Sequence, residues 1–326
     1  MTLPLVSIII PVYNSATHVS EAVQSALGQT WQNIEIILID DGSTDNSLSI
    51  IQSFAADNVK VLYQTNKGAS VARNRGLHEA SGEFIQYLDA DDLLSPNKIE
   101  DQMKLLQLNK DHICTCGTVH FLEDEDPVTR PVVQNWMGEG SSEPLDFLIK
   151  LYGGDLIGPG YGGMVAVHSW LCSRAILDTA GRWDEKLSMD DDGEYFCRVI
   201  LASKGIVYAK NAVCYYRQYI KHKSLSALLN TRGYQSMLDA IDLKYKYMVE
   251  ASHDKVLVDK IFGAMYAQAA ITTYPHFPNQ SNYAKKKANA LGLFHFKYRA
   301  GPISNFLTKI FGWRVMRRIN YVRHKL

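Results

Sequence analysis

The chain has 326 residues, 46% hydrophobic and 21% charged, so it can form a globular core, and wholesale disorder or a coiled coil is excluded. Its 34 Lys and Arg balance 34 Asp and Glu, but twelve basic residues and no acidic one lie from position 260 onward. This leaves 22 basic against 34 acidic residues in 1–259, so an acidic body precedes a basic tail.

Five cysteines, an odd number without a CxxC pair, argue against a disulfide framework and a zinc site and favour a reducing compartment. The first residues lack the features of a signal peptide, and the least polar later stretch, 261–271, is shorter than the roughly 20 residues that span a bilayer. We therefore expect a soluble or peripheral cytoplasmic protein. Because the basic residues cluster in a tail without an RNA-binding motif, no nucleic-acid partner is expected.

Residues 5–110 alternate between short β-branched runs and amphipathic segments, which is typical of βαβ units. The last of the predicted helices, 96–109, is expected to have Ser95 as its N-cap and Pro96 at its first position. The pattern predicts an α/β fold with a Rossmann-like, mostly parallel central sheet flanked by helices. The predicted strands are 5–12, 34–39, 59–63 and 83–88, and the predicted helices are 17–28, 44–56, 68–80 and 96–109.

The next segment mixes predicted strands at 113–120, 164–171 and 205–216 with Gly-rich and acidic loops. We expect these strands to complete the same sheet. Beyond about residue 220 the pattern becomes helical. The sequence therefore predicts one α/β domain over 1–217, made of the halves 1–110 and 111–217, and a mainly helical, basic extension over 218–326.

Two predicted strands end in acidic clusters, 40–45 and 89–92. The carboxyl ends of parallel strands form the ligand crevice of such sheets, so both clusters should face one site. The first cluster equally suits turn and N-cap chemistry. In the second, three carboxylates within four residues repel one another unless a cation is present, and Asp89 and Asp91 project to the same side. Such oxygen ligands suit Mg²⁺ or Mn²⁺ bound together with a diphosphate.

A third acidic cluster, 190–194, lies about 100 residues later at the start of a predicted helix. It either stabilises the helix dipole or holds a general base near the metal site. The loop 66–68 follows the predicted strand 59–63 and precedes Arg73 and Arg75. The loop would offer backbone N–H groups, and the two arginines would offer guanidinium groups, to phosphate oxygens. Arginine on a helix is also often simply solvated.

Five sequence blocks follow one another along the first half of the chain: 6–14 (VSIIIPVYN), 25–30 (SALGQT), 40–45 (DDGSTD), 66–68 (NKG) with 72–74 (ARN), and 88–92 (LDADD). In this order and spacing they resemble the family 2 glycosyltransferases. The resemblance covers residues 5–110, and 181–185 with Asp191 and Asp192 extends it to about residue 200. Residues 220–326 carry no motif of the family.

The resemblance implies a GT-A fold that binds a UDP-sugar with Mn²⁺ or Mg²⁺, with 1–110 as the nucleotide-sugar half and 111–217 as the acceptor and catalytic half. It makes Asp192 the catalytic base, with Asp191 as the alternative, because the family's Glu-Asp pair stands here as two aspartates followed by Gly193. It assigns the metal to Asp91. The nucleotide-sugar residues that it implies are Pro11, Tyr13, Asp41, Asn66, Gly68, Arg73, Asp89 and Asp91.

The expected function is that of an inverting, metal-dependent hexosyl- or N-acetylhexosaminyltransferase. It would move one sugar to a hydroxyl of a glycan or lipid-linked acceptor in bacterial surface polysaccharide synthesis. The Gln-x-x-Arg-Trp motif of processive synthases is absent, hence a single transfer is expected. The alternative is a non-catalytic GT-A-like sugar-binding or scaffold protein. A phosphatase that uses Asp-x-Asp is disfavoured because Asp92 and Leu93 follow the pair instead of Thr or Val.

The tail interleaves apolar and aromatic residues with arginines, which predicts an amphipathic helix within 302–326. We expect this helix to lie on the anionic inner leaflet of a membrane, where lipid-linked acceptors are found. The alternative is a helix docked on the acidic body.

Overall fold

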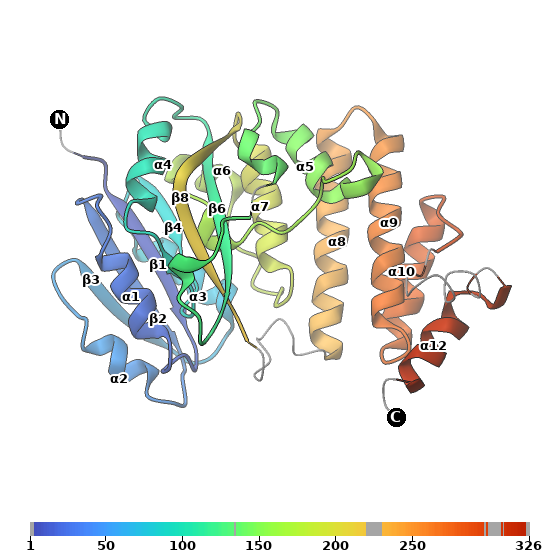
Figure 1. Cartoon of the computed structure of the whole chain (residues 1–326), viewed down its shortest axis with the longest axis horizontal. Coiled ribbons are helices and arrows are strands. Elements are labelled where there is room, and N and C mark those ends of the chain that lie inside the picture. The colour runs from blue at the N-terminus through green and yellow to red at the C-terminus, as the bar shows by residue number, and fades with distance from the viewer. Residues whose placement is uncertain are drawn as a thin grey trace.

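The computed structural model describes residues 3–133, 135–219, 230–296, 298, 308 and 310–323. It is an α/β fold in which two sheets lie among helices, and the last helices form one end of the molecule (Figure 1). The first sheet has the strand order β3-β2-β1-β4-β7, and β7 alone among these strands runs antiparallel to its neighbour. The bounds are β1 Val6–Val12, β2 Ile34–Asp41, β3 Val59–Gln64, β4 Phe84–Tyr87 and β7 Cys172–Ser173.

Each strand and helix expected in 5–110 is present, although the helices are shorter than predicted. β1 and β2 are buried along nearly their whole length, because helices cover both faces of the sheet, and this explains their continuous Ile, Val and Leu runs. The expected α/β, mostly parallel architecture is therefore confirmed. The helices are α1 Val19–Leu27, α2 Ser47–Gln52, α3 Ala69–Glu79 and α4 Lys98–Leu106.

The helix α3 packs unusually close to the sheet. A Cβ on Gly76 would lie 2.3 Å from Cγ2 of Ile9 and 2.8 Å from Cδ1 of Ile39, so only glycine fits at this contact. The close approach sets α3 directly on β1 and β2 and carries Arg73 toward the carboxyl ends of the strands.

Two expectations for 111–217 are wrong. The strands β5 (Leu93–Leu94), β8 (Ile206–Gln218) and β6 (Ile113–Leu122) form a separate sheet in that order. The free edge of the short strand β4 is taken by β7, so β6 pairs with β8 instead. The segment 164–171 is not a strand: the amide of Ser169 bonds to the carbonyl of Ala166 at 3.0 Å and closes a 3₁₀ turn.

The C-terminal extension is helical, as predicted, and packs on the α/β part through a shared core. That core contains Tyr195, Leu238 and Phe262, which come from α7, α8 and α9. None of the described helices has the length and apolarity needed to span a bilayer. The remaining helices are α5 Pro144–Gly153, α6 Arg174–Ala180, α7 Asp191–Ala202, α8 Thr231–Ala251, α9 Lys255–Thr273, α10 Pro278–Ala290 and α12 Trp313–Arg323, with 3₁₀ turns η1 Pro127–Thr129, η2 Trp136–Glu139, η3 Gly154–Leu156 and η4 Val167–Ser169.

Candidate functional site

The carboxylate of Asp41, at the end of β2, is buried and fully engaged. It accepts hydrogen bonds of 2.8 Å from the amides of Lys67 and Gly68 and from the side chain of Gln64. Gly68 has a φ of +99°, a conformation that favours glycine, and it caps the start of α3. Asp41 therefore joins β2 to the loop before α3, while Asn66 in that loop is exposed.

The ends of β1 and β2 are joined as well. The side chain of Asn14 accepts a hydrogen bond of 2.8 Å from the amide of Thr44, and the amide of Ala16 donates to Asp45 at 3.0 Å. Pro11, near the end of β1, and Tyr13, just beyond it, are both half-buried and lie beside this junction. The residues expected to bind the nucleotide thus gather at the carboxyl ends of neighbouring strands.

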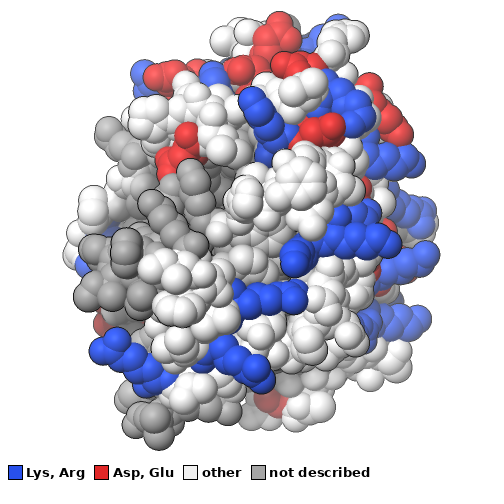
Figure 2. Space-filling model, turned by 90° about the vertical axis from the view of Figure 1, so that its right-hand side faces the viewer, with Lys and Arg blue, Asp and Glu red and all other residues white. Residues whose placement is uncertain are grey.

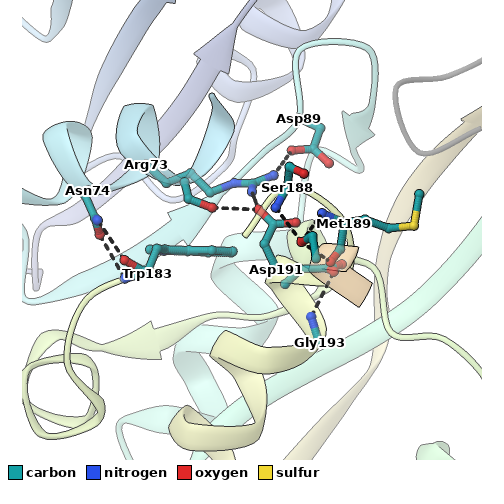
Figure 3. Close-up of polar contacts among 11 residues, drawn as sticks. Arg73, Asn74, Asp89, Trp183, Ser188, Met189, Asp191 and Gly193 are labelled. Atoms are coloured by element: carbon teal, nitrogen blue, oxygen red, sulfur yellow. Dashed lines mark hydrogen bonds and ion pairs between the residues drawn. The ribbon is translucent and has the colours of Figure 1, made fainter. Parts of the chain in front are cut away.

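Arg73 of α3 connects two acidic clusters that are about 100 residues apart in the sequence (Figure 3). Its guanidinium lies 2.8 Å from Oδ1 of Asp89 and 3.0 Å from Oδ2 of Asp191, and it stacks 4.5 Å from the ring centre of Trp183. Burial by itself would lower the pKa of Arg73, but Asp89 and Asp191 outweigh it and hold the pKa above its ordinary value. Arg73 is therefore a permanent cation at the centre of the site.

Asn74, the next residue, fixes the segment that carries Trp183. Its side chain accepts from the amide of Trp183 at 2.9 Å and donates to the Trp183 carbonyl at 3.0 Å and to Glu185 at 2.9 Å. The ring of Trp183 in turn stacks on Tyr195 of α7 at 4.1 Å. These contacts bring the start of α7 next to α3.

The cluster 89–92 is anchored by the end of β8. Tyr219 donates its hydroxyl to Oδ2 of Asp91 at 2.8 Å, and Arg217 donates its amide to Oδ1 of Asp92 at 2.7 Å. Burial, together with the charge of Asp89, raises the pKa of Asp91. Burial and the charges of Asp91 and Asp89 raise the pKa of Asp92 further. A cation placed here would relieve this repulsion.

Three side chains at this cluster form a group of ligands that fits a divalent cation. Asp89, Asp92 and His168 each offer a ligand atom, and these atoms lie within 4.8 Å of one another. His168 is fully buried, and its Nδ1 lies 3.3 Å from Oδ2 of Asp92, although neither ring nitrogen makes a hydrogen bond of good geometry with a described residue. The carboxylate oxygens suit Mn²⁺ or Mg²⁺ bound together with phosphate oxygens, and of these two ions Mn²⁺ accepts an imidazole nitrogen more readily. Asp91, the residue expected to bind the metal, is adjacent to this group.

The two candidate bases have different surroundings. Oδ2 of Asp191 accepts from Ser70 at 2.9 Å and from Arg73, whereas Asp192 accepts only from the amide of Gly193, at 2.8 Å, within the described part of the chain. Burial and the neighbouring charges of Asp191 and Asp190 raise the pKa of Asp192 to about 7. A carboxylate of that pKa with a free oxygen is suited to take a proton at neutral pH.

Comparison with known proteins identifies the family. Residues 7–168 match the model of glycosyl transferase family 2. The chain contains a family 2 glycosyltransferase domain. It is 38% identical over 156 residues to an uncharacterized glycosyltransferase of Haemophilus influenzae, covering 47% of this chain and 59% of that one. It is also 44% identical over 125 residues to the glycosyltransferase GlyG of Streptococcus pneumoniae serotype 4, covering 37% and 41%. The matches thus span less than two thirds of these relatives.

Solved structures resemble nearly the whole chain in fold, including the part beyond the family 2 domain. The structure of S. aureus TarS 1-349 in complex with UDP-GlcNAc aligns with a TM-score of 0.71 and 18% identity, covering 98% of this chain and 92% of that one. The structure of TarS 1-349 in complex with UDP aligns with a TM-score of 0.62 and covers 89% and 88%. At this identity the likeness establishes the expected GT-A fold.

Several residues around the site of the family 2 domain were not found by the sequence analysis. His168 lies 76 positions beyond Asp92, and Arg217 and Tyr219 lie beyond the segment that matches the family model. No motif or spacing in the sequence connects these residues to the acidic clusters. For Arg217 and Tyr219 the one local signal is the aromatic and basic content at the end of β8.

Proposed function

We propose that this family 2 domain transfers a single hexosyl or N-acetylhexosaminyl unit from a UDP-sugar to a hydroxyl of a glycan or lipid-linked acceptor, with inversion. The observation that supports it most is the double ion pair of Arg73 with Asp89 and Asp191. This pair joins the acidic cluster of the donor side to the helix that carries Asp192. The TarS structures with UDP-GlcNAc and UDP favour a uridine nucleotide as the donor's leaving group.

In this proposal Pro11, Tyr13 and Asn66 contact the uridine, and Asp41 and Gly68 shape the loop beneath it. Asp91, with the group formed by Asp89, Asp92 and His168, would hold Mn²⁺ or Mg²⁺. The bound cation would offset the negative charge of the departing diphosphate.

The chain's own residues perform the remaining steps. Asp192 removes the proton from the acceptor hydroxyl as its oxygen bonds to the anomeric carbon, and the bond from that carbon to the diphosphate breaks on the opposite face. Arg73, already cationic and buried, stabilises the charge that develops nearby. One displacement inverts the configuration, and one proton ends on Asp192.

Calorimetric titration of the full chain with UDP, GDP and dTDP, with and without Mn²⁺, tests the donor site. We expect UDP to bind tightest and only weakly without metal. Incubation with UDP-sugars and glycan acceptors should then release UDP. If UDP-sugars bind but no transfer or hydrolysis occurs with any acceptor, the alternative of a sugar-binding or scaffold protein replaces this proposal. Bacterial surface polysaccharide synthesis is the setting that we propose for the reaction.

We also place a membrane contact on α12. The inner face of α12 is docked: Met316 is buried, and Trp313 stacks on Phe296 at 5.6 Å. Its outer face exposes about half of each of three apolar side chains, Val315, Ile319 and Val322. The rest of the predicted tail segment, 302–307, 309 and 324–326, lies outside the described residues.

Basic side chains surround that exposed stripe. Arg318 and Arg323 are exposed on α12, and Lys286 is exposed on α10. Figure 2 looks onto this end of the molecule and shows Lys and Arg spread over it, with Asp and Glu gathered toward the top. An apolar stripe flanked by cations fits the surface of an anionic bilayer, which supports a peripheral position on the cytoplasmic leaflet.

Sedimentation with phosphatidylglycerol vesicles and with phosphatidylcholine vesicles tests this contact. We expect the chain to pellet with the anionic vesicles and a variant with Val315, Ile319 and Val322 replaced by serine to lose most of that binding. The matched control replaces three other exposed apolar residues, Leu108, Val128 and Val256. Equal pelleting of the stripe variant and the control variant would contradict the proposal. So would the finding that the triple serine variant binds vesicles normally and loses only self-association of the chain.

A further inference from the structure

The loop that leads into α7 is held by α8, a helix outside the segment that matches the family model. The hydroxyl of Ser236 accepts from the amides of Ser188 and Met189 at 2.8 and 3.0 Å and donates to the carbonyl of Met189 at 3.0 Å. Ser236 is 3% exposed, so these three bonds are shielded from water. One buried hydroxyl therefore fixes two consecutive residues of the loop.

A second residue of α8 holds the next position. Nζ of Lys244 lies 2.5 Å from Oδ2 of Asp190, and the lysine side chain is 4% exposed. Asp190 has a φ of +61°, which is uncommon for a residue other than glycine and must be maintained by its contacts. A Cβ on Gly193 would lie 2.0 Å from Oδ1 of Asp190 and 3.3 Å from Nζ of Lys244. Glycine at 193 thus lets the Asp190 carboxylate fold over the first turn of α7 to meet the lysine.

Four carboxylates lie at the start of α7, at positions 190, 191, 192 and 194, and the nearby cations are distributed unevenly among them. Lys244 pairs with Asp190, Arg73 with Asp191, and Arg198 with Glu194. Tyr247, which like Lys244 comes from α8, also donates to Glu194 at 3.1 Å. Among the described residues, the carboxylate of Asp192 has no such partner. The pairing occupies the neighbouring carboxylates and leaves Asp192 as the one of the four that is not held by a cation in the described part of the chain.

We propose that α8 positions the catalytic carboxylates, with Lys244 and Ser236 as the positioning residues that hold the 188–193 loop. The inference rests on the proposed function and extends it, because it assigns to the C-terminal extension a role in the chemistry of the family 2 domain. Neither residue touches the reacting atoms. Both act through the loop that places Asp192.

The decisive variant is Lys244→Met, which keeps the length of the side chain and removes its charge. We expect kcat to fall about 10²-fold, since misplacing a catalytic group by 1 Å costs about that much, while KM for the UDP-sugar changes little. Lys246→Met is the matched control, because Lys246 lies on the same helix with its side chain 65% exposed. Lys244→Arg should restore part of kcat, and Ser236→Ala should lower kcat in the same sense.

Two further measurements separate positioning from a general structural effect. Asp192 faces Asp190 and Asp191 of its own helix, Arg73 of α3 and Tyr216 of β8, while Lys244 of α8 offsets Asp190. Without that lysine, the acidic limb of the kcat profile should move to higher pH. Amide hydrogen exchange at 188–193 should accelerate in Lys244→Met and Ser236→Ala but not in Lys246→Met.

A folded Lys244→Met protein with normal kcat, an unmoved pH profile and unchanged exchange would overturn the inference while the proposed function stands. If Lys244→Met does not fold, the Ser236→Ala variant is judged by its kcat and by the amide exchange at 188–193, because it removes no charge and is not expected to move the pH profile. If the wild type transfers no sugar, the proposed function fails instead. The exchange rates then decide whether α8 holds the loop, and unchanged rates reject that as well.

Discussion

Replacing Asp192 with asparagine is expected to lower kcat by about 10²- to 10⁴-fold, the range for loss of a general base. The amide keeps the shape of the side chain and can still accept from the amide of Gly193, so UDP binding should be unchanged. The measurement is the initial rate of UDP release with saturating UDP-sugar and acceptor. Asp178→Asn, an exposed aspartate on α6, is the matched control and should behave as wild type.

The pH dependence provides a second criterion for the same residue. Asp192 accepts a proton only when ionised, and its pKa is raised to about 7, first by burial and then by Asp191 and Asp190. The wild-type kcat should therefore rise with pH up to about 7 and level off above it, and the residual rate of the asparagine variant should lack this limb. A normal rate in Asp192→Asn together with loss of the limb in Asp191→Asn would transfer the role to Asp191.

Asp192→Asn should lose activity without losing stability against unfolding. A carboxyl whose pKa is higher in the folded than in the unfolded state contributes stability that is lost as pH rises from the unfolded value of 3.8 to the folded value of about 7. At pH 8 the wild type lacks this contribution and asparagine carries no charge to bury. Thermal unfolding at pH 8 should therefore show Asp192→Asn to be at least as stable as wild type.

Replacing Asp91 with asparagine is expected to abolish most of the metal-dependent binding of UDP. An ionised carboxylate binds Mn²⁺ or Mg²⁺ much more strongly than a neutral amide oxygen does, and an amide at this position also disturbs the hydrogen bond from Tyr219. In calorimetric titrations we expect UDP affinity in Mn²⁺ to fall at least about tenfold, toward the value of the wild type in EDTA. Asp57→Asn, an exposed aspartate before β3, is the control.

A parallel variant, His168→Gln, measures how much the buried imidazole contributes to the metal site beside Asp91. If the metal is held mainly by Asp91, His168→Gln should retain metal-dependent UDP binding and Asp91→Asn should not. The reverse result would assign the cation to Asp89, Asp92 and His168 and contradict the assignment to Asp91. Because burial and Asp89 raise the pKa of Asp91, removing its charge should not lower the melting temperature at neutral pH without metal.

Local patterns were sufficient to predict the first half of the fold. The strands of 5–110 are buried β-branched runs bounded by turn residues, and each acidic cluster directly follows or begins an element, so chain order alone brings 40–41 and 89–92 to one edge of the sheet. The segment 164–171 differs from the predicted strand because its apolar residues fill the core from a 3₁₀ turn. A period of two does not distinguish these cases.

The sequence by itself determined the βαβ rhythm, the acidic strand ends and the resemblance to a glycosyltransferase family, since each of these depends on residues close together in the chain. Only the tertiary structure decided that Arg73 pairs with Asp191, that His168 lies beside Asp92, and that Lys244 holds Asp190. These partners are 118, 76 and 54 positions apart. Their contacts follow from the packing of separate elements around a common core, which no local pattern of side chains specifies.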